Sequence, residues 1–314
     1  MKVLMFGRGV ISTQYAWAFE KAGHTVEFYV RKGRIAQYGE TVSLNIYDAR
    51  KKIKGVLVNE NWKVKLREDL SASHDYDLIF VSVQHYHLRD AVDFLADKIG
   101  NATVLIFNNI WDEPKEITSK FPANQVAWGS PGAGGGFDKE GVLNGTLWGS
   151  VNIGTFGNDP TPRDIEVMDL FKSSGFKITE INDFRSWLFS HFVFNAAMHL
   201  ENMKYSGLAP LAVLQTTSYW QNIILNGKEL LPLLKVLNVD LKAGVDLKLL
   251  NFPPVILSIM IKLIISFLPS MKQLFTGHSN FNELKSCCKD VFLKAKELKI
   301  NLPRYEERKS LFMN

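Results

Sequence analysis

Residues Lys2–Arg34 decide the fold, and they read KVLMFGRGVISTQYAWAFEKAGHTVEFYVRKGR. The apolar run Lys2–Phe6 predicts a buried strand, and Gly7 and Gly9 predict a tight turn before a helical stretch. A second apolar run, Thr25–Val30, predicts another strand after that helix. Strand, glycine-rich turn, helix and strand in this order are typical of a dinucleotide-binding βαβ unit.

The glycine turn carries the predicted phosphate contacts. Gly7 permits the tight turn, and Gly9 lets the backbone approach a pyrophosphate at the N-terminus of the helix, where amides and the helix dipole favour anions. Ser12 takes the third position of the motif, which requires close packing of helix on strand, and serine is only slightly larger than alanine. The predicted cofactor contacts in this turn are Gly7, Gly9, Val10, Ile11 and Ser12. An ordinary βαβ unit with a glycine-rich turn is the alternative.

The end of the second strand indicates which dinucleotide binds. A chain selective for NAD places Asp or Glu there to hold the ribose 2′-hydroxyl, whereas a cation suits the extra phosphate of NADP. This chain offers Arg31, Lys32 and Arg34 at that point, and no carboxylate. The sequence therefore predicts NADP(H) as cofactor, with Arg31 as the residue that decides it.

Composition limits the class of protein. The chain has 314 residues, 46% of them hydrophobic and 22% charged, which is typical of a globular protein with room for two domains. The net charge of +5 is modest and the basic residues are dispersed, so we expect no nucleic-acid partner. Cys287 and Cys288 are the two cysteines, and their adjacent placement suits neither a zinc site nor a usual disulfide. We expect no metal and a reducing, cytoplasmic location.

The most apolar segment is the predicted helix Val255–Phe267. It is shorter than the roughly 20 residues that span a bilayer, carries Lys262 near its middle, and is bounded by prolines. We expect a buried or interface helix, no membrane partner, and a candidate homodimer surface. No secretory signal is expected, because the N-terminus leads directly into a strand.

The pattern along the chain changes near residue 182. Up to that point strands and helices alternate, and afterwards helices alone are predicted. The further predicted strands are Asp77–Val83, Thr103–Phe107, Gln125–Trp128 and Leu147–Phe156, and the later helices are Ser186–Lys204, Leu211–Asn238, Val255–Phe267 and Asn282–Leu298. Gly132–Gly136 is followed by no helical pattern, so we interpret it as a flexible connection between strands. The sequence predicts an α/β Rossmann-type NADP-binding domain over residues 1–181 and an all-α substrate and dimerisation domain over residues 182–314.

Two sets of residues are candidates for chemistry. In open α/β sheets ligands bind beyond the carboxyl ends of the strands, which places Gln84 and Asn108 beside the cofactor. On the helix that begins near Ser186, His191, Asn195 and His199 are four residues apart and share one face. Since that helix is apolar nearly all round, its polar groups must find partners or line a cleft. A turn asparagine and a core histidine are the structural alternatives.

The chain resembles the ketopantoate reductase family over nearly its whole length. The matching pieces, in the family's order, are Lys2–Gly9 with its glycine turn, Arg31 after the second strand, Asp77–Val83 followed by a polar residue, Asn108 after Thr103–Phe107, the Trp187–Ala197 helix, and Glu283 followed by Leu298–Pro303. The resemblance implies the family's two-domain fold and NADPH-dependent reduction of a small 2-oxo acid such as 2-dehydropantoate, a step of pantothenate biosynthesis.

The resemblance also implies roles for residues at matching positions. In the family, a lysine on the first interdomain helix donates a proton to the keto oxygen of the substrate. His191 occupies that position in this chain. Asn108 would position the acid and the cofactor, Asn195 would bind substrate, and Glu283 would hold the substrate hydroxyl beside the acid.

Three further family positions are altered here. Gln84 replaces a second family lysine, His199 replaces a substrate-binding asparagine, and Ser270 is an approximate counterpart of a substrate-binding serine. An imidazolium can donate a hydrogen bond to a carbonyl that becomes an alkoxide, and histidine exchanges protons near neutral pH. We therefore expect His191 to act as the acid, with a neighbouring Glu283 carboxylate favouring its protonated form.

Three functions remain open on this sequence. The first is an NADPH-dependent reductase of a 2-oxo acid, with His191, Glu283 and Asn108 as catalytic residues. The second is an opine-type or hydroxy-acid dehydrogenase on the same two-domain plan, since such enzymes can use histidine as acid or base. The third is a non-catalytic NADP-binding protein.

Overall fold

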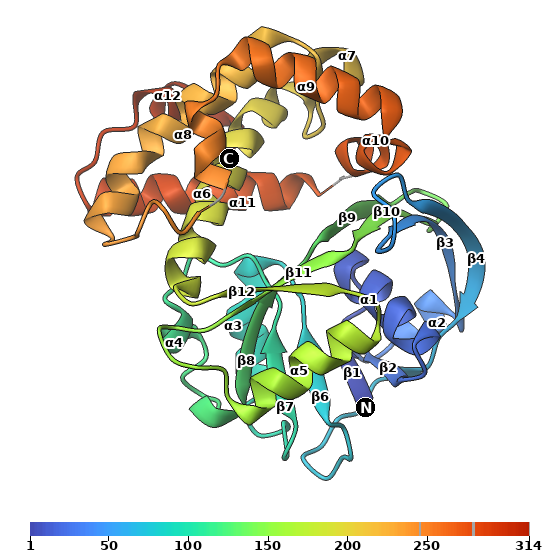
Figure 1. The fold of residues 1–314 in the computed structure, drawn as a ribbon. Coiled ribbons are helices and arrows are strands. Elements are labelled where there is room, and N and C mark those ends of the chain that lie inside the picture. The colour runs from blue at the N-terminus through green and yellow to red at the C-terminus, as the bar shows by residue number, and fades with distance from the viewer. Residues whose placement is uncertain (245, 278–279, 314) are drawn as a thin grey trace. The chain divides into compact units, whose positions relative to one another are not determined.

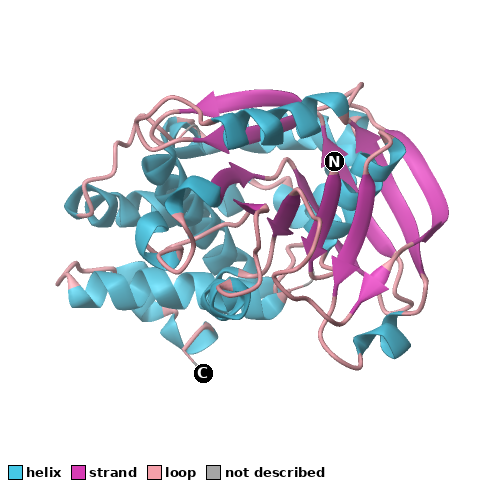
Figure 2. Cartoon of the chain, turned by 90° about the horizontal axis from the view of Figure 1, so that it is seen from below, coloured by secondary structure: helices cyan, strands magenta, loops and turns pink. Residues whose placement is uncertain are grey.

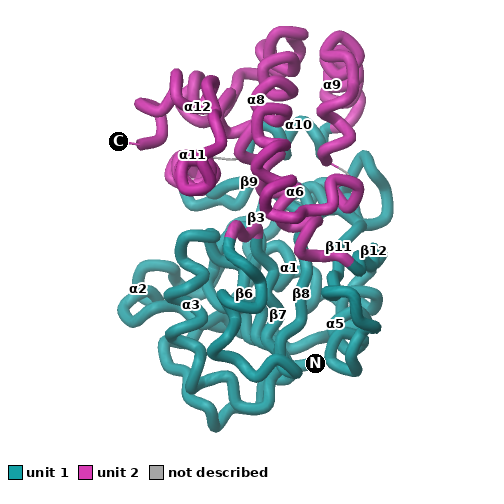
Figure 3. Tube along the Cα trace, turned by 90° about the vertical axis from the view of Figure 1, so that its left-hand side faces the viewer, with its two compact units in different colours: residues 1–108, 112–182, 269–277 teal, residues 109–111, 183–268, 278–314 magenta. Residues whose placement is uncertain are grey.

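The protein is described by a computed structural model that covers residues 1–244, 246–277 and 280–313 (Figure 1). The chain divides into two compact units (Figure 3). Unit 1 comprises residues 1–108, 112–182 and 269–277, and unit 2 comprises residues 109–111, 183–268 and 278–314. Residues 269–277 therefore pack with the N-terminal unit, although the predicted division at residue 182 assigned them to the helical domain.

A large sheet forms the centre of unit 1. Its strand order is β12 (Lys177–Ile181), β11 (Ser150–Gly154), β8 (Val126–Ser130), β7 (Thr103–Ile106), β6 (Leu78–Val81), β1 (Lys2–Phe6), β2 (Thr25–Tyr29) and β5 (Leu66–Arg67). Neighbouring strands are parallel, except that β8 and β11 are antiparallel. The strands from β8 to β5 consequently end at one edge of the sheet, which is where ligands bind in this architecture.

A second, smaller sheet was not predicted from the sequence. Its strand order is β4 (Val56–Lys63), β3 (Thr41–Ala49), β10 (Leu143–Trp148) and β9 (Ala133–Phe137). Every strand of the described chain lies between Lys2 and Ile181. Figure 2 draws the strands in magenta and the helices in cyan. The predicted α/β unit followed by an all-α unit is therefore confirmed, with the small sheet as an addition to unit 1.

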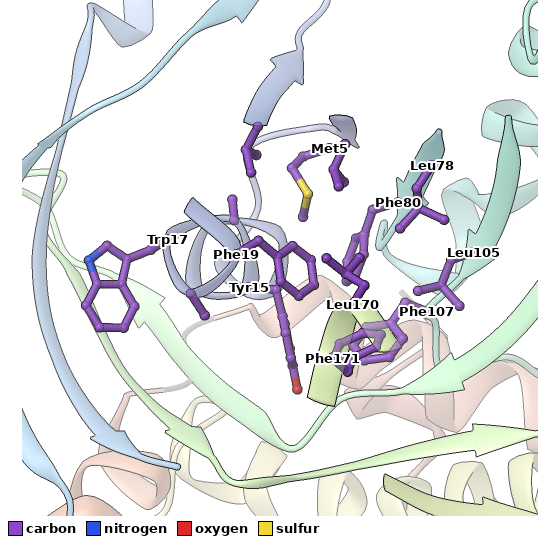
Figure 4. Close-up of a cluster of buried hydrophobic side chains, with 14 of the residues drawn as sticks. Met5, Tyr15, Trp17, Phe19, Leu78, Phe80, Leu105, Phe107, Leu170 and Phe171 are labelled. Atoms are coloured by element: carbon purple, nitrogen blue, oxygen red, sulfur yellow. The ribbon is translucent and has the colours of Figure 1, made fainter. Parts of the chain in front are cut away.

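Helix α1 (Val10–Lys21) joins the two sheets through a shared core. It packs against β1 and β2 of the large sheet and against β9 and β10 of the small one. Tyr15 at its centre is fully buried, and its ring lies 5.1 Å from Phe107 and 5.7 Å from Phe171 between ring centroids (Figure 4). The other helices of unit 1 are α2 (Arg34–Tyr38), α3 (Leu88–Leu95), α4 (Pro114–Ile117), α5 (Pro162–Ser173) and α10 (Pro269–Thr276). This aromatic core fixes the start of α1 against the end of β1.

Two predictions about glycine-containing segments are wrong. Leu147–Phe156 is not one strand, because β10 ends at Trp148 and β11 begins at Ser150 in the other sheet. Between them, a Cβ on Gly149 would lie 2.4 Å from the Arg50 carbonyl oxygen, so only glycine fits there. Gly132–Gly136 is not a flexible connection, since most of it forms β9. A Cβ on Gly134 would lie 2.3 Å from Leu274, so the glycines let α10 pack closely on this strand.

Unit 2 contains helices and no strand within its described residues. Its helices are α6 (Phe184–Asn202), α7 (Leu211–Leu214), α8 (Thr217–Val236), α9 (Pro254–Phe267), α11 (Phe281–Glu297) and α12 (Pro303–Glu307). The predicted helix Leu211–Asn238 is thus two helices, because the Thr216 side chain accepts a hydrogen bond from the Tyr219 amide and starts a new one. Helix α6 packs on α8 and α11, and the buried thiol of Cys288 donates to the Ala196 carbonyl at 3.4 Å.

Helix α9 is buried on one face only. Leu257 and Ile265 are buried, whereas the opposite face exposes a stripe of large apolar side chains. The stripe consists of Val255, Ile256, Ile259, Met260, Leu263 and Phe267. Phe267 is 71% exposed and Leu263 52%. In the described parts of the chain no single helix is long and apolar enough to cross a membrane, and the bent pair α9 and α10 reaches that threshold by length and composition alone.

Candidate active site

The glycine turn leaves an open anion site at the end of β1. Gly7 has φ of +95°, in the region that favours glycine, and a Cβ there would meet nothing within 4 Å. Gly9 is the N-cap of α1 and offers no side-chain cap, and the first turn of the helix contains no acidic residue. The first amides of α1 therefore have no capping side chain, which suits a bound pyrophosphate.

Residues Val10, Ile11 and Ser12 form the first turn of α1. Val10 and Ile11 are half-buried, whereas the Ser12 side chain is fully buried. The Ser12 hydroxyl has no hydrogen-bond partner among the described residues. Its side chain is therefore enclosed by the protein, which fits the close packing that the third position of the motif requires.

The basic loop after β2 is exposed. Arg31 and Lys32 form no ion pair within the described chain, and Arg34 donates a hydrogen bond to the Gln37 side chain. Sequence reasoning missed a carboxylate at this loop. Glu68, which follows β5, accepts a hydrogen bond from the Ile35 amide at 2.8 Å.

Arg8 is a second residue that the sequence did not single out. It stands between the two glycines of the turn, and its guanidinium lies 4.2 Å from the ring centroid of Tyr38 in α2. The Arg8 Nη1 also donates to the Thr41 carbonyl at 3.4 Å. Burial lowers the pKa of Arg8 from its usual value. These contacts tie the glycine turn to the far end of the basic loop.

Gln84 and Asn108 follow β6 and β7, at the same sheet edge as the glycine turn. The Gln84 Oε1 accepts a hydrogen bond from the Tyr86 hydroxyl at 2.9 Å, and the Asn108 Nδ2 donates to the Val83 carbonyl. Asn108 is buried, and its Oδ1 has no hydrogen-bond partner in the described chain. An orphaned acceptor at this edge can be satisfied by a ligand hydroxyl, so the residues fit the nicotinamide ribose of a dinucleotide.

In unit 2, His191, Asn195 and His199 lie along one face of α6, each of them half-buried. His191 is held on two sides. Its Nδ1 lies 2.6 Å from the Asp246 Oδ2, and its ring stacks on Trp187 with centroids 4.8 Å apart and an interplanar angle of 12°. A carboxylate on Nδ1 fixes the imidazole tautomer and leaves Nε2 to exchange a proton.

The carboxylate that contacts His191 is Asp246, a residue that the sequence did not single out. Sequence reasoning missed Asp246 because it lies 55 residues from His191, at the start of the 3-10 helix η4 (Asp246–Asn251). Glu283 is half-buried in the first turn of α11. Helix α11 packs against α6, and its Cys288 thiol donates to the Ala196 carbonyl.

Ser270 makes its side-chain and backbone contacts within its own unit. It belongs to α10 in unit 1 and is fully buried. Its hydroxyl donates to the Ile53 carbonyl at 2.7 Å, and its own carbonyl accepts from the Thr146 hydroxyl. These contacts dock α10 on the small sheet, so the structure gives Ser270 a packing role where the resemblance implied substrate binding.

A sequence model of the ketopantoate reductase family PanE/ApbA matches residues 3–158, the N-terminal half of the chain. No curated protein sequence matches significantly.

Solved structures share the whole fold. D-mandelate dehydrogenase, determined with NADH and anilino(oxo)acetate, superimposes with a TM-score of 0.72 and 15% identity, over 100% of this chain and 97% of that one. A PanE/ApbA family ketopantoate reductase from Ralstonia eutropha superimposes with a TM-score of 0.69 and 16% identity. The match covers 100% of this chain and 97% of that one. A dimeric ketopantoate reductase from Staphylococcus aureus superimposes with a TM-score of 0.65 and 14% identity. The match covers 100% of this chain and 98% of that one.

Proposed function

The chain belongs to the ketopantoate reductase family, a family of oxidoreductases, and from that premise we propose that it is an NADPH-dependent reductase of a 2-oxo acid. The observation that carries the proposal is the hydrogen bond between His191 and Asp246. It supplies an oriented acid at the position where the family has its lysine. A chain without that lysine thereby keeps a group that can protonate the developing alkoxide.

The proposed cofactor site lies at the carboxyl edge of the large sheet. The glycine turn and the first amides of α1 would hold the pyrophosphate, and Arg31 would contact the 2′-phosphate. Asn108 would hold the nicotinamide end through its unpartnered Oδ1, and Gln84 would lie beside it. A bound NADPH would supply the hydride that reduces the carbonyl carbon of the substrate.

The proposed substrate site is the polar face of α6. His191 Nε2 donates a proton to the carbonyl oxygen, so that the keto group becomes a hydroxyl as the carbon receives hydride. Asp246 stabilises the imidazolium before transfer and keeps Nδ1 protonated afterwards. Asn195, His199 and Glu283 orient the substrate by hydrogen bonds, and Ser270 is left out because its hydroxyl is engaged in packing.

A panel of 2-oxo acids tests the function. We expect NADPH to be consumed with a 2-oxo acid alone, and 2-dehydropantoate belongs in the panel. Turnover that requires an added amino acid would indicate an opine-type dehydrogenase. Tight NADPH binding with no turnover on any member would indicate a non-catalytic protein. The similarity to D-mandelate dehydrogenase makes aromatic 2-oxo acids the second class to include.

We also propose that the exposed stripe of α9 pairs with a second copy of this chain. The six side chains of the stripe are uncharged, the exposed Lys262 borders it three residues after Ile259, and homodimer interfaces are similarly apolar. The structurally similar Staphylococcus aureus enzyme is a dimer. Light scattering should give twice the chain mass, and Leu263→Lys should return the mass to one chain. A monomeric unaltered protein would refute the pairing.

The two cysteines bear on where the reaction takes place. Cys287 and Cys288 are buried free thiols, and burial raises the pKa of both well above the usual value. They are therefore poor nucleophiles and take no part in the proposed chemistry. We propose a reducing cytoplasmic location, in which such thiols stay unoxidised.

A further inference from the structure

The loop that carries Arg31 is held by a carboxylate from another strand. Glu68 directly follows β5, which pairs in parallel with β2, so that Arg67 lies opposite Tyr29. The Glu68 Oε1 accepts a hydrogen bond from the Ile35 amide at 2.8 Å. The strand pairing thus supplies the carboxylate that the sequence lacks at the end of β2.

The local backbone is shaped to receive this carboxylate. Gly33 adopts φ of +84°, a left-handed conformation that aims successive amides toward one point. The amides of Ile35 and then Gly33 lower the pKa of Glu68 from its usual value, and the Arg34 amide adds to them. Glu68 is therefore ionised at neutral pH and is bound by the amides that begin α2.

Glu68 and Arg31 lie close enough to act on the same groups. Both charges influence the Tyr29 hydroxyl: burial is the main cause of its raised pKa, Arg31 opposes the shift, and Glu68 adds to it. Arg31, Lys32 and Arg34 bring three positive charges and Glu68 one negative charge, so the loop keeps a net charge of 3 − 1 = +2. The loop still favours a phosphate, but less than its cations alone would.

We propose that Glu68 sets the preference of this chain between NADPH and NADH, and the inference rests on the proposed binding of a nicotinamide dinucleotide at this edge. Glu68 acts in two ways. Its hydrogen bonds order the loop, which favours both cofactors, and its negative charge opposes the 2′-phosphate, which only NADPH carries. Glu68 is a positioning and selectivity residue and takes no part in hydride transfer.

Two variants separate these effects. Glu68→Gln keeps an oxygen that can accept the Ile35 amide but removes the charge, whereas Glu68→Ala removes both. Asp69→Asn is the matched control, because Asp69 is an exposed carboxylate one residue further on with no hydrogen bond to the loop among those described. Equilibrium binding of NADPH and NADH, followed by cofactor fluorescence, is the measurement, and thermal melting checks that each variant is folded.

We expect Glu68→Gln to tighten NADPH binding about 5-fold, the size expected for one unit charge a few ångströms from a phosphate in water. NADH binding should change less than about 2-fold, and the gain for NADPH should shrink at high salt, where charges are screened. Glu68→Ala should bind NADH more weakly than Glu68→Gln does. Asp69→Asn should leave the NADPH-to-NADH ratio nearly unchanged.

Two results would overturn the inference. One is an unchanged NADPH-to-NADH ratio in Glu68→Gln, and the other is an equal change in Asp69→Asn. If Glu68→Ala and Glu68→Gln bind NADH with equal affinity, the hydrogen bonds of Glu68 do not order the loop for cofactor binding. If the unaltered protein binds neither dinucleotide, the proposed function itself fails. That outcome differs from one in which both dinucleotides bind and the NADPH-to-NADH affinity ratio does not respond to Glu68→Gln.

Discussion

The nucleotide edge of unit 1 and the polar face of α6 in unit 2 are built in different ways. At the edge, each candidate group comes within three residues of the end of its own strand: Gly7 after β1, Gln84 after β6 and Asn108 after β7. On α6, the key histidine takes its partner from Asp246, 55 residues away. Parallel strands end at a common edge, so order along the chain predicts what meets there. Helix packing follows no comparable rule.

The same difference appears within unit 1. The cations of the β2–α2 loop lie close together in sequence and were predicted. Glu68 follows an edge strand of only two residues, which is too short to give a sequence pattern. Both missed carboxylates, Glu68 and Asp246, contact groups that the sequence did identify. In each unit, the sequence identified a functional segment but missed the carboxylate that holds it in place.

The largest expected effect concerns the acid on α6. His191→Ala should lower kcat for oxo-acid reduction about 10²–10⁴-fold, the usual contribution of a positioned general acid. NADPH affinity should stay within about 2-fold, because the proposed phosphate contacts lie in unit 1. Steady-state kinetics and fluorescence binding on one preparation measure both.

His191→Lys is the matched variant for that test. It places the family's amine where the imidazole stands, so it should recover part of the activity that His191→Ala loses. Full activity in His191→Ala would show that α6 is a structural helix and that the contrast between the two regions is mistaken.

The next effect concerns the nucleotide edge. Arg31→Asp should weaken NADPH binding roughly 100-fold, about 2.7 kcal/mol, because an attraction to the 2′-phosphate becomes a repulsion. NADH binding should hardly change. Titration of the variant with both cofactors provides the internal control. An equal loss of affinity for NADPH and NADH would mean that Arg31 stabilises the loop and does not contact the 2′-phosphate.

A smaller effect is expected for the partner of the acid. Asp246→Asn should lower kcat about 30-fold, since an amide no longer stabilises the imidazolium. The carboxylate orients the imidazole by its hydrogen bond to Nδ1, so the loss should appear in kcat while NADPH affinity stays within about 2-fold. An unchanged kcat in Asp246→Asn would assign Asp246 a purely structural role.

The smallest effect tests the packing of the glycine turn. Ser12→Ala removes a fully buried hydroxyl that has no partner in the described chain. Stability should rise or stay level, within about 1 kcal/mol, because an unsatisfied polar group is replaced by an apolar one. Thermal unfolding and NADPH titration should both be close to the unaltered protein, and a large loss of cofactor affinity would mean that the hydroxyl itself binds.

The predictable parts of the fold are those with a local cause. Lys2–Phe6 and Thr103–Ile106 are continuous apolar runs, so the sequence located both strands. The small sheet was missed because its strands are not continuous apolar runs buried on both faces. In β3 the alternate residues Val42, Leu44 and Ile46 are buried, whereas Val56 and Leu57 of β4 are exposed. The break at Gly149 depends on the Arg50 carbonyl, a contact that no local pattern records.

The central claim is that this chain transfers hydride from NADPH to a 2-oxo acid with His191 as acid. The most direct measurement uses NADPH deuterated at C4 of the nicotinamide and mass spectrometry of the product. We predict deuterium on the carbon that bears the new hydroxyl, formed by the unaltered protein and nearly absent with His191→Ala. Tight NADPH binding with no deuterium transferred to any 2-oxo acid, or undiminished transfer by His191→Ala, would contradict the account.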